Sequence, residues 1–174
     1  SDYYPLTLLN AALAGGGSLG LFGGGGTNKS SRLYKALVDT ELAVGVNGGM
    51  APSADPFLYT IGAVVRNGRS LAEVEAAIDA ELARLATDPI TQVELDKALK
   101  RAKAQFVMAG ESITGQAQLL GMAETVTGDY RWFETVLDDL ARVTLADMER
   151  VRGEYLRAGN RVVGWYVPES KEQA

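Results

Sequence analysis

The chain has 174 residues, 47% of them hydrophobic, and its 22 acidic and 17 basic side chains give a net charge of −5. This length and apolar content suit one globular lobe, and the negative charge disfavours a nucleic-acid backbone as a partner. Histidine and cysteine are both absent, which removes disulfides, the usual general base near neutral pH and the commonest zinc ligand. No apolar run is long enough to span a bilayer, and the compartment stays open between cytoplasmic and exported.

The first predicted element is a helix over residues 3–14, which leads into a glycine-rich loop from Gly15 to Gly26. The loop continues into residues 28–30, which approach the phosphate-binding pattern G-x-x-x-x-G-K-[ST]. Asn28 stands where that pattern requires its second glycine. Because a phosphate loop leaves a strand rather than a helix, we favour a connection between two helices over a nucleotide site.

A short helix over residues 31–39 and two strands over 42–50 and 57–65 are predicted next. Ser30 or Ser31 is placed to cap the helix. The two apolar runs are rich in β-forming residues, and the prolines of A-P-S-A-D-P between them mark a connection. This pattern predicts an antiparallel pair of strands, covered by helices on at least one face.

The rest of the sequence predicts several helices and one last strand. Three helices begin with a hydroxyl that is followed three residues later by a carboxylate, a spacing that satisfies free backbone N–H groups: Ser70 with Glu73, Thr91 with Glu94, and Thr144 with Asp147. Gly110 is expected to interrupt the second of these helices, and residues 112–126 continue a helical pattern. The run R-V-V-G-W-Y-V-P, residues 161–168, predicts a strand ended by proline.

This order of elements predicts an α+β fold, a two-layer lobe in which a mostly antiparallel sheet is covered by helices. We assign residues 1–174 to a single lobe. Three strands make a thin sheet, so we expect one or more further strands to precede Ser1 or to come from another chain. The start S-D-Y-Y-P is then a position inside a longer protein.

The sequence offers few groups for catalysis. Its neighbouring carboxylates lie on predicted helices, where charged residues normally face water. Ser30 and Ser31 have no histidine to activate them as nucleophiles. The one remaining candidate for a serine activated by a lysine is Ser30 with Lys29. Adjacent residues on a turn seldom face each other, so we assign no catalytic residue and no metal ligand.

The stretch Asn47-Gly48-Gly49 is less ordinary for a strand. Two glycines weaken a strand and often mark a bulge or a close approach by another backbone. Two interpretations stay open, namely a strand edge that accepts a peptide and a bulge without a ligand.

Several motifs, in this order and spacing, resemble the C-terminal domain of the insulinase-like zinc peptidases, the family of pitrilysin and the mitochondrial processing peptidase. They are G-G-G-T-N-K-S-S-R-L-Y at residues 24–34, the strand at 55–65, the helical segments at 70–106 and 111–130, and the segment 143–168. The resemblance implies a lobe that pairs with a homologous lobe, in the same chain or in a partner subunit, around a chamber for unfolded peptides. The sister lobe would carry zinc in an inverted H-x-x-E-H motif, which is absent here.

In many members of this family the C-terminal lobe lends an Arg and a Tyr to the substrate carbonyl. The matching positions here are Val38 and Val44, which cannot donate a hydrogen bond. Arg32 and Tyr34 lie nearby as possible substitutes, although an ion pair for Arg32 and core packing for Tyr34 are the alternatives. With residues 47–49, they form the predicted substrate-binding or lobe-contact set.

The resemblance leaves two functions open. The first is a non-catalytic lobe of a zinc endopeptidase, which helps to enclose peptides beside a zinc ion carried elsewhere. The second is a scaffold subunit of the same family without protease activity, which Val38 and Val44 favour slightly. We place the peptidase lobe first, because chains with several such lobes usually include an active one.

Overall fold

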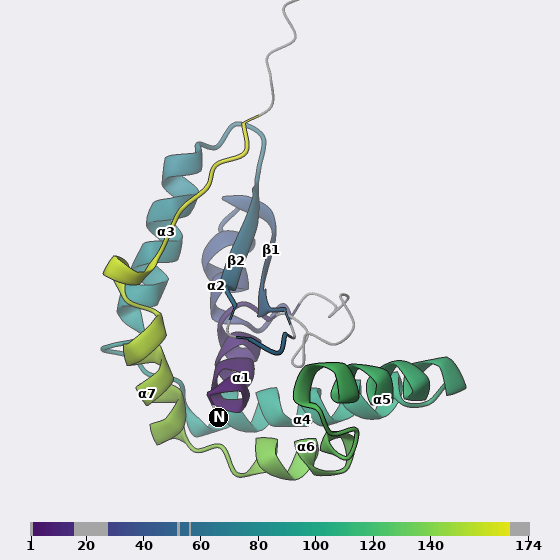
Figure 1. The fold of residues 1–174 in the computed structure, drawn as a ribbon. Coiled ribbons are helices and arrows are strands. Elements are labelled where there is room, and N and C mark those ends of the chain that lie inside the picture. The colour runs from purple at the N-terminus through teal and green to yellow at the C-terminus, as the bar shows by residue number, and fades with distance from the viewer. Residues whose placement is uncertain (1, 16–27, 52, 56, 168–174) are drawn as a thin grey trace, which may run out of the picture.

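The computed structural model describes residues 2–15, 28–51, 53–55 and 57–167. Within these ranges the elements are α1 (Tyr3–Leu13), α2 (Arg32–Leu37), β1 (Ala43–Met50), β2 (Tyr59–Val65), α3 (Leu71–Arg84), α4 (Gln92–Ala109), α5 (Ile113–Thr127), α6 (Trp132–Ala141), α7 (Leu145–Tyr155) and the 3₁₀ helix η1 (Ala158–Asn160). The chain forms an α+β lobe in which an antiparallel pair of strands packs against helices (Figure 1). The predicted fold class is confirmed.

Helix α1 is the centre of the lobe. Every residue from Pro5 to Leu13 is buried, although the spacing of its leucines alone indicates one buried face. The reason is that α1 contacts β1, α2, α4, α6 and α7, so that neighbours cover the helix on all sides. Figure 1 shows α1 between the sheet at one end of the lobe and α4 and α6 at the other.

The three predicted capping pairs begin α3, α4 and α7. In each of them the hydroxyl accepts a hydrogen bond from the third backbone N–H, and the carboxylate accepts one from the capping residue. Gly110 ends α4, as expected. Ser31 precedes α2 but its side chain does not cap the helix, because its hydroxyl donates instead to the carbonyl oxygen of Asn28 at 2.8 Å.

The predicted last strand is wrong for the part of it that the structure describes. Residues 161–167 pair with no strand of the described chain, and Pro168 lies outside the described residues. Their composition favours an extended backbone, but a strand also needs a neighbour to take its hydrogen bonds. Strand β2 is also shorter than predicted, since Phe57 and Leu58 precede it.

Arg32, the first residue of α2, joins this helix to the start of α4. Its side chain is 7% exposed, and its guanidinium donates to both carboxylate oxygens of Glu94 at 2.8 and 2.9 Å. It also donates to the carbonyl oxygens of Asp88 and Pro89, at 2.6 and 2.9 Å. Because Glu94 also caps α4 through Thr91, one carboxylate stabilises both the helix start and its link to α2.

Gly48 of β1 marks the closest approach of α1 to the sheet. A Cβ atom at Gly48 would lie 2.6 Å from the Cβ of Ala14 and 2.7 Å from Oδ1 of Asn10. The Asn10 amide, only 2% exposed, donates to the carbonyl oxygen of Gly48 and accepts from the Tyr59 hydroxyl, both at 3.0 Å. One buried amide therefore connects α1 to both strands, and the close packing there requires glycine.

We expect Gly48→Ala to lower the free energy of unfolding by about 2 kcal/mol, because the added methyl group overpacks the contact between α1 and β1. Gly45→Ala on the same strand is the control, since a Cβ atom there has no neighbour within 4 Å. It should change stability by less than about 0.5 kcal/mol. Urea denaturation measures both values, and equal effects of the two variants would contradict the packing argument.

The ion pair also predicts a dependence of stability on pH. The hydrogen bond from Arg32 is the largest cause that lowers the pKa of Glu94 from 4.5 to about 2. A carboxylate with a lowered pKa in the folded state contributes stability above its unfolded pKa, and this contribution is lost as pH falls towards 2. Glu94→Gln should therefore cost about 3 kcal/mol at pH 7 and progressively less between pH 5 and pH 2.

Glu111→Gln is the control for this experiment, because Glu111 is exposed on the turn after α4. Denaturation at a series of pH values compares each variant with the unaltered protein. A deficit of Glu94→Gln that stays constant from pH 7 to pH 2 would exclude the carboxylate charge as its cause.

Candidate functional site

The strand pair presents one face to α1 and one face to solvent. In the antiparallel register, Gly45 is opposite Val64, Asn47 is opposite Gly62, and Gly49 is opposite Thr60. The alternating residues Val46, Gly48, Ile61, Ala63 and Val65 pack towards α1 and the core. We call the six residues on the other side the outer face: Gly45, Asn47, Gly49, Thr60, Gly62 and Val64.

The outer face is flat because three of its six residues are glycine. A Cβ atom at Gly62 would approach only the side chain of Asn47, and one at Gly45 would contact nothing within 4 Å. Asn47 is exposed, and its amide makes no hydrogen bond within the described residues. The face therefore offers an accessible strand backbone with one unused amide, which carries donors and an acceptor.

The predicted stretch of residues 47–49 divides between the two faces. Asn47 and Gly49 lie on the outer face, whereas Gly48 packs against Asn10 and Ala14 of α1. The bulge interpretation is wrong for these glycines, because both stay in regular register with β2. The irregularity in the ladder lies between Ala43 and Gly45 instead.

Arg32 and Tyr34 lie on α2 rather than on the outer face. The guanidinium of Arg32 is bound to the turn between α3 and α4 and to Glu94, as described above. Tyr34 is half-buried and packs against the core. Of the two valines that replace the expected Arg and Tyr, Val38 ends α2 and is half-buried, whereas Val44 lies at the irregularity of β1 and is exposed.

The predicted phosphate-like loop lies mostly outside the described residues, which include Gly15 and continue again at Asn28. The Asn28 amide donates to the carbonyl oxygen of Ala11 in α1 at 3.1 Å, and its Oδ1 accepts from the hydroxyl of Ser30 at 2.8 Å. The hydrogen bond from Asn28 thus connects the residues before α2 to α1. The loop joins α1 to α2, in agreement with the predicted connection between helices.

The described residues do not fit a metal site. No group of three or more acidic side chains among them is arranged to hold a metal ion, and the chain has no histidine or cysteine. The described part of this lobe therefore offers no set of side chains that would bind a zinc ion.

Among the described residues, no helix is both long and apolar enough to cross a membrane.

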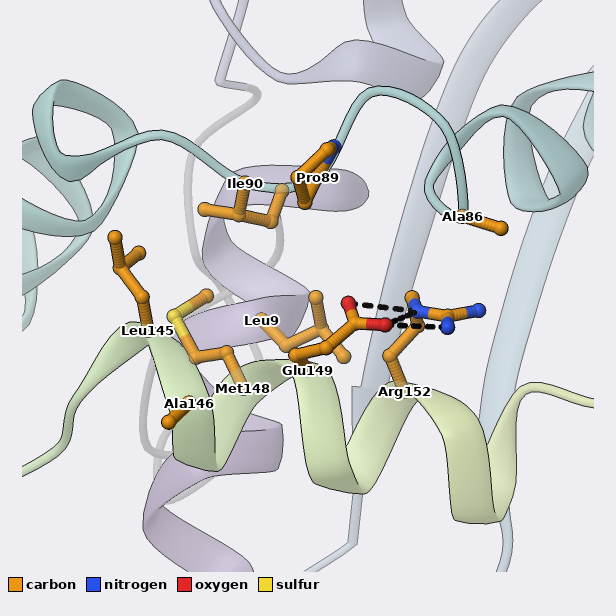
Figure 2. A pocket seen from close by; sticks show the side chains of 9 residues that line it. All are labelled: Leu9, Ala86, Pro89, Ile90, Leu145, Ala146, Met148, Glu149 and Arg152. Atoms are coloured by element: carbon orange, nitrogen blue, oxygen red, sulfur yellow. Dashed lines mark hydrogen bonds and ion pairs between the residues drawn. The ribbon is translucent and has the colours of Figure 1, made fainter.

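A separate cavity of about 300 Å³ lies between α1, the turn before α4, and α7 (Figure 2). Its lining consists of Leu9, Ala86, Pro89, Ile90, Leu145, Ala146, Met148, Glu149 and Arg152. Figure 2 shows the two charged side chains paired with each other, and the Nε of Arg152 donates to Oε2 of Glu149 at 2.9 Å. The cavity suits apolar groups, and its one carboxylate is already neutralised by Arg152.

Two features of the site were not predicted from the sequence. The pairing of Asn47 with Gly62 depends on the strand register, which the sequence did not define. The role of Asn10 was also missed, although an amide in a largely apolar helix stretch was a visible signal. The hydroxyl of Tyr59 donates to the Asn10 amide oxygen, and its burial there raises the pKa of the phenol above the ordinary value. The hydroxyl therefore stays protonated and remains a hydrogen-bond donor.

Comparisons with known proteins agree with this structure. Residues 1–102 match the family described as the Peptidase M16 inactive domain. An uncharacterized zinc protease of Mycobacterium leprae is 28% identical over 166 residues, which are 94% of this chain and 34% of that protein. The chain thus spans about a third of the length of this curated relative.

Two solved structures extend the similarity to the fold. The inactive peptidase domain of a protein assigned as a zinc protease in Bordetella parapertussis is 28% identical, with a TM-score of 0.81, and the match covers 99% of this chain and 87% of that chain. A protein with the same assignment from Bordetella pertussis is 30% identical, with a TM-score of 0.78 and coverage of 96% and 85%. The family match, which includes α1, α2 and both strands of the outer face, shows that this chain belongs to the Peptidase M16 inactive-domain family.

Proposed function

We propose that this chain is the non-catalytic lobe of a zinc endopeptidase and that its outer face helps to bind peptide substrates. The observation that carries the proposal is a flat strand face whose Asn47 amide makes no hydrogen bond among the described residues, on a lobe without histidine. Membership in a family of inactive peptidase domains supports the non-catalytic role. The zinc ion would belong to a homologous sister lobe, in the same longer polypeptide or in a partner subunit.

The outer face has the chemistry for an extended peptide. Such a peptide exposes alternating N–H and C=O groups, and the Asn47 amide can donate to one and accept from another. The glycines at positions 45, 49 and 62 permit close approach of a second backbone, while Val64 offers an apolar contact. A contact made over glycines depends little on the side chains of the peptide, which suits unfolded peptides of varied sequence.

Arg32 and Tyr34 have a smaller place in this proposal. All three nitrogens of the Arg32 guanidinium are already hydrogen-bonded inside the lobe. Contact of either side chain with a peptide or with the sister lobe stays a prediction. The residues to which we assign peptide contact are Asn47 and Gly49.

A scaffold subunit is the second candidate function. The observation in its favour is that Val38 and Val44 stand where many members of the family carry donors to the substrate. Valine cannot stabilise a developing oxyanion, so this lobe can assist hydrolysis only through binding and enclosure. The scaffold function applies if the complete protein, which carries Val38 and Val44 in this lobe, has no sister lobe that binds zinc.

We expect Asn47→Trp to raise KM for an unfolded peptide about tenfold in the zinc-containing protein, because the indole covers the glycines of the outer face. The value of kcat should change little, since the residue is not assigned a role in bond cleavage. Gln118→Trp, on an exposed position of α5, is the matched control. Equal KM values for the two variants would remove the outer face from the binding site.

Zinc removal separates the peptidase lobe from the scaffold. Chelation should abolish peptide hydrolysis by the complete protein and leave the unfolding of this lobe unchanged, because the described lobe holds no metal ligand set. The measurements are zinc content per chain, peptide hydrolysis and thermal unfolding with and without chelator. Absence of both zinc and hydrolysis in the native protein would support the scaffold.

A further inference from the structure

Two of the five asparagines in the chain, Asn47 and Asn67, are followed by glycine. Such a pair can lose ammonia without an enzyme, because the glycine residue has no Cβ atom that would hinder the attack of its nitrogen on the asparagine side chain. The two pairs lie in different surroundings, since Asn47 belongs to β1 and Asn67 follows β2. The surroundings should therefore decide which pair reacts.

Asn67 and Gly68 form the middle of an exposed turn between β2 and α3. The backbone N–H of Arg69 donates to the carbonyl oxygen of Arg66 at 3.0 Å and closes the turn. Gly68 has a φ of +85°, which a type II turn requires at this position and which glycine adopts without strain. Both central residues are exposed, and Figure 1 shows the connection at the opposite end of the lobe from α4.

Few contacts hold this pair in place. A Cβ atom at Gly68 would have no neighbour within 4 Å. The Asn67 side chain makes no hydrogen bond among the described residues, and the Gly68 N–H donates to no backbone group there. Rotation of the backbone can therefore bring the Gly68 nitrogen to the Asn67 side chain at the cost of the one hydrogen bond that closes the turn.

The same pair in β1 is held by the sheet and by α1. Gly48 is opposite Ile61 in the ladder, and the carbonyl oxygen of Gly48 accepts a hydrogen bond from the Asn10 amide at 3.0 Å. A Cβ atom at Gly48 would lie 2.6 Å from the Cβ of Ala14, so the backbone there has little room to move. Ring closure at Asn47 therefore requires β1 to leave both the ladder and α1.

We propose that Asn67 is a site of spontaneous deamidation and that the strand ladder protects Asn47. The backbone nitrogen of Gly68, once it has lost its proton to solvent base, forms a bond to Cγ of Asn67, and the bond from Cγ to Nδ2 breaks. Nδ2 takes up a proton from solvent and leaves as ammonia, so that a cyclic imide remains. Addition of a water molecule opens the imide at either carbonyl and gives aspartate or isoaspartate, without any oxidant or reductant.

Either product places a new carboxylate between two basic residues. Arg66 and Arg69 flank the pair in the sequence, and their ion pairs with Glu41 and Glu73 are long, at 3.8 and 3.9 Å. Neighbouring positive charge favours the ionised form of the new carboxyl group. Isoaspartate also adds a carbon atom to the backbone that leads into Ser70, the cap of α3.

Incubation of the complete protein at mildly alkaline pH tests the proposal, with proteolysis and mass spectrometry to quantify each Asn-Gly peptide separately. We expect Asn67 to convert about tenfold faster than Asn47, because the strand must open locally before Asn47 can react. In guanidinium chloride, where both sequences are unfolded, the two rates should agree within about threefold.

Equal rates at the two sites in the folded protein would overturn the proposal. A ratio of rates that stays the same in guanidinium chloride would also overturn it, because the difference would then come from neighbouring residues in the sequence and not from the turn. The product tests the route as well, since only the imide gives isoaspartate. Aspartate without isoaspartate would show direct hydrolysis by water and would overturn the proposed step.

Asn67→Gln and Asn47→Gln form a matched pair of variants. Glutamine keeps the amide, but its longer side chain disfavours closure of the ring. Ion-exchange chromatography separates the more acidic form that accumulates on storage, and we expect this form to persist in Asn47→Gln and to fall about tenfold in Asn67→Gln. Equal accumulation in both variants would overturn the proposal. These results do not depend on zinc or on peptide hydrolysis, which test the proposed function separately.

Discussion

The bidentate hydrogen bond between Arg32 and Glu94 joins two parts of the lobe that are far apart in sequence. Arg32 begins α2, which packs against β1, and Glu94 lies in the first turn of α4, which packs against α1. The same guanidinium also binds two carbonyl oxygens of the turn between α3 and α4. One nearly buried cation whose hydrogen bonds are satisfied therefore links the helix beside the sheet to the start of α4.

The two neighbouring glycines of β1 have different functions. Gly48 faces α1, where Asn10 and Ala14 leave no space for a side chain, and this contact positions the sheet. Gly49 lies on the outer face, where the lack of a side chain leaves the backbone accessible. Successive strand residues point to opposite faces of the sheet. Glycine is therefore needed at position 48 for close packing, whereas at position 49 it leaves the backbone accessible to solvent.

The lobe combines a well-packed interior with a sheet of two strands in the described chain. Helix α1 is enclosed on all sides, and the capping boxes satisfy the starts of three helices. The strand pair and residues 161–167 instead expose apolar side chains and backbone edges within the described chain. In a family of inactive peptidase domains, these exposed groups support the binding role that we propose.

The sequence by itself determined the elements whose signals are local. The capping pairs at Ser70, Thr91 and Thr144 each place a helix start, because a hydroxyl and a carboxylate three residues apart bond to the nearest backbone. The absence of histidine likewise determined that the chain brings no imidazole to a zinc ion. Only the tertiary structure decided the strand register, the close approach of α1 to Gly48 and the lack of a partner for residues 161–167. These features depend on contacts between residues distant in the chain, which local patterns do not specify.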